Sequence, residues 1–151
     1  MKLYKREGRR FVAINLEYNA GKYYQKDGSF TDHKDDNSIG FCIISSIKED
    51  VIISLTDIGT EGRTFTFSEA KKALLYTSSV FTEIPKIHEI VIPLTKYKSQ
   101  CNIKNCHGYW CEDMASVACA ARAGYYGIAD TYAASGAWYV AGLRPVLRLK
   151  H

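Results

Sequence analysis

Four side chains with the chemistry of metal ligands lie within residues 101–111, CNIKNCHGYWC. Cys101, Cys106, His107 and Cys111 offer three thiolates and an imidazole, which are donor types that zinc prefers. Structural zinc sites usually present paired cysteines at both ends, whereas the second half of this stretch is irregular and carries Trp110. A nucleophilic Cys111 beside His107 would need an orienting third group, and no pattern marks one. We therefore predict no metal, no cofactor and no catalytic group.

The thiols as a whole favour the same interpretation. The five cysteines are Cys42, Cys101, Cys106, Cys111 and Cys119. An odd number of cysteines in a chain without a secretion signal argues against a disulfide framework. The N-terminal MKLYKREGRRFVAINLEY carries charges where a signal peptide needs a continuous apolar segment, and no run approaches the ~20 apolar residues that span a bilayer. The sequence predicts reduced thiols, no signal peptide and no membrane insertion.

The charge balance is mildly basic, with a net charge of +4 and a pI near 8.7. Basic residues are scattered along the chain except for Lys5, Arg6, Arg9 and Arg10 near the start. A nucleic-acid surface normally shows a clustered basic stripe. We therefore expect a solvated basic arm at the N-terminus and no nucleic-acid partner.

Length and composition predict a single domain over 1–151 that positions these side chains. The chain has 151 residues, of which 46% are hydrophobic and 24% are charged, enough to form one core. RFVAINLEY and GKYYQKDGSF read as short strands, and Asp27-Gly28 supplies a tight hairpin turn. IGFCIISSI and DVIISL read as a second hairpin with largely buried strands, separated by Lys48, Glu49 and Asp50. The first half of the chain is thus predicted to be rich in strands.

Helices are expected in the middle of the chain. Ser68 can cap a helix over 68–78 whose apolar face carries Ala70, Ala73 and Leu74. IPKIHEIVIPL lies between Pro85 and Pro93, and its isoleucines share one face if its middle is a short helix. Strand-rich ends around helices predict an α+β domain whose N- and C-terminal strands lie close together in the sheet.

Residues 124–147, GYYGIADTYAASGAWYVAGLRPVL, begin with small and aromatic residues and end on a firm apolar and Arg-Pro pattern. Binding surfaces selected for adaptability favour Tyr as a rigid anchor among small polar neighbours. The anchors would be Tyr125, Tyr126, Tyr132 and Tyr139. Any one of these rings could instead pack in the core, but so alanine-rich a run supplies little apolar volume to bury all four. Arg144 and Pro145 are expected to be a buried ion-pair member and an edge-strand proline.

The order of several segments carries a resemblance to a known family. These segments are GKYYQKDGSF, SIGFCIISS, VIISLTD, FTFSEAKKAL, IPKIHEI, GYWCED and AWYVAGLRPVLRL. In this order they resemble the C-type lectin-like domains common in gut bacteria and their phages, a family that includes the formylglycine-generating enzyme branch. The most specific pieces are Tyr109-Trp110 and the closing GLRPVL at 142–147. The resemblance, from about residue 20 to the end, implies a C-type lectin fold: a mixed, mainly antiparallel sheet, one or two helices, an irregular display region and a closing strand at 142–150.

In that family, the segment between the YW and RP motifs is rewritten in the variable proteins of diversity-generating retroelements. Mutagenesis there is aimed at adenines and turns AAC codons into NNC codons, which never encode Lys, Gln, Glu, Met or Trp. Residues 113–141 contain no Asn, Lys or Gln, although the preceding TKYKSQCNIKNC, residues 95–106, contains all three. Only Met114 and Trp138 lie outside the NNC set, so they would be fixed frame residues.

The resemblance implies a ligand-binding module of a phage or bacterium, not an enzyme, in the cytoplasm or in a phage virion. Its ligand would be a protein, its state is compatible with an oligomer, and Trp110 and Trp138 would join Arg144 and Pro145 as the frame. The predicted ligand-binding residues are Asp113, Ser116, Tyr125, Tyr126, Asp130, Tyr132, Ser135 and Tyr139. Six of them, without Asp113 and Ser116, are expected mainly on one exposed face.

Two other classes of function stay open. A non-diversified lectin-like domain would bind glycan, but the Glu-Pro-Asn and Trp-Asn-Asp runs of calcium-dependent sugar binding are absent, and Glu112-Asp113 is a poor substitute. A formylglycine-generating-type oxidase would need a cysteine pair that no motif marks.

Overall fold

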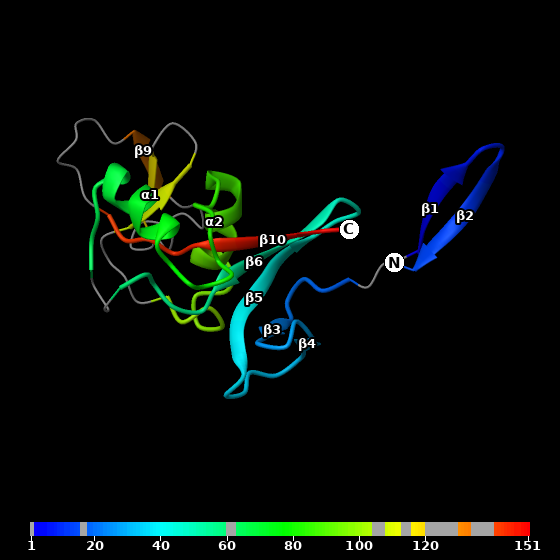
Figure 1. The fold of residues 1–151 in the computed structure, drawn as a ribbon, viewed down its shortest axis with the longest axis horizontal. Coiled ribbons are helices and arrows are strands. Elements are labelled where there is room, and N and C mark those ends of the chain that lie inside the picture. Colours follow the sequence, from blue (N-terminus) through cyan, green and yellow to red (C-terminus); the bar gives the residue numbers. More distant parts are fainter. Residues whose placement is uncertain are drawn as a thin grey trace.

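Strands in three sheets and two helices make up the part of the chain that the computed structural model describes, which is residues 2–15, 18–59, 63–103, 108–112, 116–119, 130–133 and 141–151 (Figure 1). The strands are β1 (Lys2–Glu7), β2 (Arg10–Asn15), β3 (Tyr23–Gln25), β4 (Phe30–Thr31), β5 (Ser38–Ser45), β6 (Glu49–Ser54), β7 (Tyr109–Cys111), β8 (Ser116–Cys119), β9 (Asp130–Ala133) and β10 (Val146–Lys150). The helices are α1 (Phe67–Leu75) and α2 (Ile87–Thr95). The predicted α+β class is confirmed.

The central sheet is antiparallel and has the strand order β10-β6-β5-β3-β4. Both predicted hairpins form within it. Gly28, with φ of +89°, lies in the turn between β3 and β4, a conformation that glycine adopts without steric penalty. Between β5 and β6 the Ser46 hydroxyl oxygen accepts hydrogen bonds from the backbone N–H groups of Lys48 and Glu49. The apolar runs of β5 and β6 are buried, so this hairpin forms the centre of the core.

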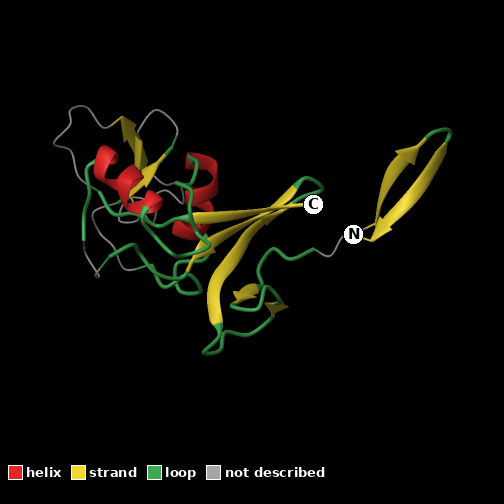
Figure 2. Cartoon of the chain, viewed as in Figure 1, coloured by secondary structure: helices red, strands yellow, loops and turns green. Residues whose placement is uncertain are grey.

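The N-terminal strands form a separate sheet, so the prediction that they lie beside the C-terminal strand is wrong. β10 pairs with β6 at one margin of the central sheet, whereas β1 and β2 pair only with each other. Their turn is Gly8-Arg9, and Gly8 has the positive φ of +62° that a tight hairpin needs at its first turn position. This two-stranded ribbon stands apart from the other described segments (Figures 1 and 2). Charges interrupt the apolar alternation of β1, which is why the sequence indicated only an arm.

Both predicted helices form, with different ends. The N-cap of α1 is Thr66 and not Ser68: the Thr66 hydroxyl accepts from the Glu69 N–H at 3.2 Å, and the Glu69 carboxylate accepts from the Thr66 N–H at 2.9 Å. This reciprocal pair satisfies donors that a helix start leaves free. In α2, Pro93 lies inside the helix near its C-terminal end instead of after it.

The core has parts on either side of β7. Ile90 and Leu94 of α2 pack with Phe41 and Ile53 of the central sheet and with Tyr109. A second cluster joins α1 to the end of the chain and consists of Phe65, Ala70, Leu74, Ile84, Trp110, Ala141 and Leu143. Within the described ranges, neither helix has the length and apolar character needed to cross a membrane.

Candidate functional site

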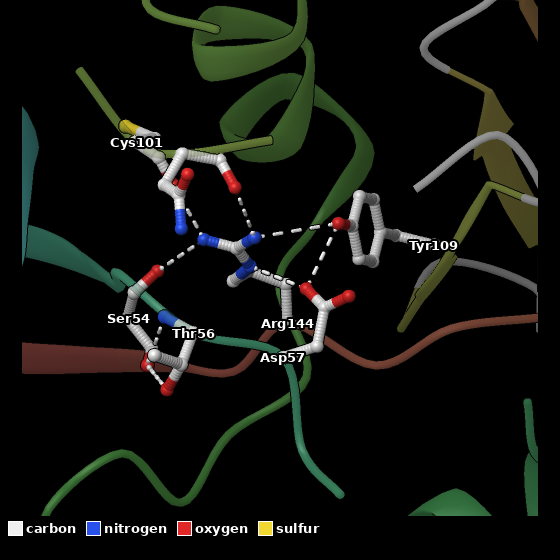
Figure 3. A network of polar contacts seen from close by, with 7 residues as sticks. Ser54, Thr56, Asp57, Cys101, Tyr109 and Arg144 are labelled. Atoms are coloured by element: carbon white, nitrogen blue, oxygen red, sulfur yellow. Dashed lines mark hydrogen bonds and ion pairs between the residues drawn. The ribbon is translucent and has the colours of Figure 1, made fainter. Parts of the chain in front are cut away.

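Arg144 lies at the centre of a polar network just before β10 (Figure 3). Its side chain is 2% exposed, and its Nε donates to Asp57 Oδ1 at 2.7 Å. The remaining four guanidinium donors have acceptors as well. Nη1 donates to the carbonyl oxygens of Ser54 at 3.0 Å and Cys101 at 2.6 Å, and Nη2 to the Asn102 carbonyl at 3.2 Å and Tyr109 Oη at 3.4 Å. A guanidinium has five N–H donors, so this buried cation is fully hydrogen-bonded. The predicted buried ion pair of Arg144 is confirmed.

Tyr109 and Asp57 complete the network. Tyr109 Oη donates to Asp57 Oδ1 at 2.8 Å while it accepts from Arg144, so the three groups form a closed triangle (Figure 3). Burial raises the pKa of Tyr109 well above its usual range, although the Arg144 charge opposes this, so the phenol stays a proton donor. Asn102 has φ of +54°, a left-handed conformation that Asn tolerates better than most residues. The network ties together β6, β7, the segment after α2 and the start of β10.

Trp110 is the second fixed point of this region. Its side chain is 1% exposed, its indole N–H donates to the Phe65 carbonyl at 2.7 Å, and its ring lies 5.3 Å from the Phe67 ring. A buried indole usually has such a hydrogen-bond partner. Trp110 therefore joins β7 to the start of α1, as expected of a frame residue.

The two ends of the candidate variable region are held side by side. Trp110 N–H donates to the Gly142 carbonyl at 3.0 Å, and Gly142 N–H donates to the Gly108 carbonyl at 2.9 Å. Tyr109 and Gly142 thereby form a parallel bridge. Next to it, Ala141 and Phe65 exchange two backbone hydrogen bonds of 2.8 and 3.0 Å. Residues 112–140 therefore leave from and return to one fixed place in the fold.

β8 and β9 are the described parts of that region, and with β7 they make a three-stranded antiparallel sheet. Tyr132 lies opposite Val117, which in turn lies opposite Trp110, so position 132 belongs to the Trp110 face of this sheet. Asp130 lies on the same face of β9 as Tyr132, and Ser116 lies on the other face. Three predicted contact positions are thus brought into one sheet.

The other predicted positions fall outside the described residues: Asp113, Tyr125, Tyr126, Ser135, Trp138 and Tyr139. The exposure of all eight contact side chains stays a prediction.

A groove of about 590 Å³ beside α1 was not predicted from the sequence. Leu75 and Ile84 contribute apolar surface to it, and Lys71, Glu83 and Glu112 contribute charge. Glu112 adjoins the candidate variable region, and its N–H donates to the Pro85 carbonyl at 2.9 Å. Leu75 is 79% exposed, and Tyr76 beyond it 87%. The run Leu74-Leu75-Tyr76 could have indicated this exposed apolar surface in the sequence, because its apolar side chains continue beyond Leu74, the last buried residue of α1.

Cys42, Cys101 and Cys111, the cysteines whose burial the structure describes, are buried. Burial raises the pKa of Cys42 and of Cys101 to about 12 in each case. Cys111 is buried as well, whereas Cys106 and His107 of the considered zinc set lie outside the described residues. In the ranges that the structure describes, no three His, Cys, Asp or Glu side chains gather as metal ligands would.

The geometry is that of a segment whose two ends are joined by backbone hydrogen bonds beside the buried, hydrogen-bonded side chains of Trp110 and Arg144. No protein-family model, no curated protein and no solved structure matches the chain.

Proposed function

We propose that the chain is a ligand-binding module of the C-type lectin fold whose segment 113–141 is a sequence-variable surface diversified by a retroelement. Its ligand is a protein on another cell or host, and the module has no catalytic activity. The predicted contact residues lie in this segment, and Trp110, Arg144 and Pro145 hold the frame.

The observation that carries the proposal is the closure of the segment's two ends. The bridge between Tyr109 and Gly142 and the paired Phe65 and Ala141 fix the chain on both sides of residues 112–140. Immediately outside this closure lie Trp110 and Arg144, both almost completely buried and hydrogen-bonded. A surface that is to change sequence without unfolding the protein needs such an invariant mount, because binding segments are best placed on a rigid scaffold.

Composition supports the same function. Residues 113–141 combine Tyr with Ala, Ser, Gly and Asp, and they lack Asn, Lys and Gln. Tyr supplies large contact area with little loss of conformational entropy, and the small residues leave room for neighbours to adapt. The groove beside α1, which exposed Leu75 lines, would extend the contact surface on the side where Glu112 enters the segment.

The decisive test is the DNA that encodes the protein. We expect a near-copy of the region for residues 113–141 close to the gene, differing from it only at positions where the copy has adenine. Genes from related isolates should then differ within this region and agree in the codons for Trp110, Trp138 and Arg144. Isolates that vary evenly along the gene, with no such copy nearby, would contradict the proposal.

A further inference from the structure

The β1–β2 ribbon, defined as residues 2–15 with the Gly8-Arg9 turn included, carries the whole net charge of the chain. It contains five of the 20 basic residues and one of the 16 acidic residues, a net +4 that equals the net charge of all 151 residues. Residues 16–151 therefore contain 15 basic and 15 acidic residues and have no net charge. A ribbon that concentrates charge in this way is suited to an acidic partner surface.

The ribbon also exposes apolar side chains on both faces. Tyr4 is 62% exposed, Phe11 71% and Val12 40%. Strand alternation puts Tyr4 and Phe11 on one face and Val12 on the other. Both outer edges of the ribbon lack a neighbouring strand among the described residues. An isolated two-stranded hairpin is marginally stable in water, so a further strand or surface is needed to stabilise this one.

An acidic surface beside a sheet margin is present on the same chain. The exposed acidic segment, residues 26–36, carries four carboxylates, at Asp27, Asp32, Asp35 and Asp36, against two lysines. It contains β4 (Phe30–Thr31), the last strand of the central sheet, which pairs only with β3 in the described chain. The segment thus offers both negative charge and a free strand edge.

We infer that two copies of the chain form a dimer in which the β1–β2 ribbon of each docks against the acidic segment and β4 of the other. Such a reciprocal contact closes with two-fold symmetry, the commonest arrangement of homo-oligomers. Pairing of ribbon with ribbon would bring two net charges of +4 together and is disfavoured. This association uses neither the candidate variable region nor its ligand, so it stands apart from the proposed binding function.

Sedimentation equilibrium of the full chain over a wide concentration range, at low and high salt, tests the dimer. We expect a concentration-dependent dimer whose dissociation constant rises with salt, because exposed charges are screened. Reversal of two individual ribbon charges in the variant Arg9→Glu/Arg10→Glu removes the ribbon's net charge and should weaken the dimer at least about ten-fold. The variant Asp35→Lys/Asp36→Lys in the acidic segment should weaken it by a similar factor. Mixing these two variants should restore association through both contacts, since the unchanged ribbon of one meets the unchanged acidic segment of the other and the two changed sites meet at the second contact. Combining all four changes in one chain should likewise restore the dimer.

The matched control is Lys71→Glu/Lys72→Glu, which changes the net charge by the same amount on the exposed side of α1 and should leave the dimer intact. Circular dichroism of each variant separates loss of association from loss of folding. A monomer at all concentrations, association that survives both reversals, or reversals that the combination does not rescue would overturn the inference. So would a monomeric chain whose ribbon binds a DNA duplex or phosphatidylserine vesicles in an Arg9- and Arg10-dependent way, since the ribbon would then serve a polyanion.

Discussion

Arg144 shows how one residue can fix several segments of a chain that are far apart in sequence. It binds Asp57, which precedes it by 87 residues, and carbonyl oxygens from β6 and from the segment after α2. The ion pair was predictable from an Arg-Pro pair in an apolar closing segment. Its partners were not, because no periodicity relates residues so distant in sequence.

Substitution of Arg144 should therefore destabilise the fold strongly. Arg144→Ala leaves Asp57, whose side chain is only 12% exposed, without its cation, and we expect the free energy of unfolding to fall by about 3–5 kcal/mol. Arg144→Lys keeps the charge but offers fewer donors in a different geometry, so its loss should be smaller but clear. Urea denaturation measures both, with Lys48→Ala at the exposed turn between β5 and β6 as a control that changes stability by no more than about 0.5 kcal/mol. An Arg144→Lys variant as stable as the parent would show that the five-donor geometry is unimportant.

Cys42 and Cys101 make stability depend on alkaline pH. Burial raises the pKa of each thiol from its ordinary 9.0 to about 12 in the folded protein. Unfolded thiols lose their protons above about pH 9, whereas the folded ones keep them until about pH 12, so unfolding releases protons in this window. The free energy of unfolding should be unaffected by these thiols below pH 9 and should fall above it, by about 1.4 kcal/mol per pH unit for each thiol at most.

Denaturant melts between pH 8 and pH 11 measure that slope, and Cys42→Ala/Cys101→Ala should make it shallower whatever the variant does to absolute stability. Tyr109, whose pKa burial also raises, contributes to the slope that is left. Equal slopes in parent and variant would mean that these thiols titrate alike in the folded and unfolded chain.

At the scale of elements, the sequence indicated that α1 exists but not which residue caps its N-terminus. A capping box at Thr66 and Glu69 and a cap at Ser68 are both consistent with the sequence FTFSEAKKAL, and the choice depends on where Phe65 and Phe67 pack. Long periodic segments such as β5, β6 and α1 were therefore identified correctly, whereas their ends were not. The three-stranded sheet of β7, β8 and β9 was missed because its strands are short and their sequences have no clear alternation.

Thr66→Ala should cost about 0.5–2 kcal/mol of stability, because the Glu69 N–H loses its acceptor at the helix start. Ser68→Ala, two residues along in the first turn, should change stability by less than about 0.5 kcal/mol. Thermal melts of the two variants compare these positions directly. The reverse ranking would return the cap to Ser68.

At the scale of the whole molecule, measurements of thermal stability and of partner binding should distinguish frame residues from contact residues. Substitution of the six predicted surface residues, Tyr125, Tyr126, Asp130, Tyr132, Ser135 and Tyr139, should leave the thermal midpoint within a few degrees while it abolishes partner binding, since anchors contribute ~1–4 kcal/mol each to affinity. Trp110→Ala should lower the midpoint by roughly 10 °C or more, because the loss of a buried Trp costs ~3–5 kcal/mol.

The single variant Tyr132→Ala should be compared with the six-residue variant, because position 132 is in register with Trp110 across β8 and could belong to the frame. If the six-residue variant unfolds, these side chains belong to the core and the contact surface lies elsewhere.

The overall class and the central hairpins followed from hydrophobic patterning, but the arrangement of sheets did not. The ribbon of β1 and β2 is separate from the central sheet, and nothing in its sequence indicates this, because strand pairing depends on which surfaces are already covered. Its charge was visible in the sequence, yet only the register of β1 against β2 shows that charge and aromatic surface lie on one narrow element.

The bridge between Tyr109 and Gly142 also bears on the length of the segment that it closes. Once the ends of a flexible loop are joined, the entropy lost on closure grows only with the logarithm of the number of residues, about 0.6 kcal/mol for each doubling. Insertions or deletions of several residues between β8 and β9, or between β9 and Ala141, should therefore change the stability of the frame very little. The same mount could accept segments of different length, and the shape of the surface, from flat to protruding, would then be as open to change as its chemistry.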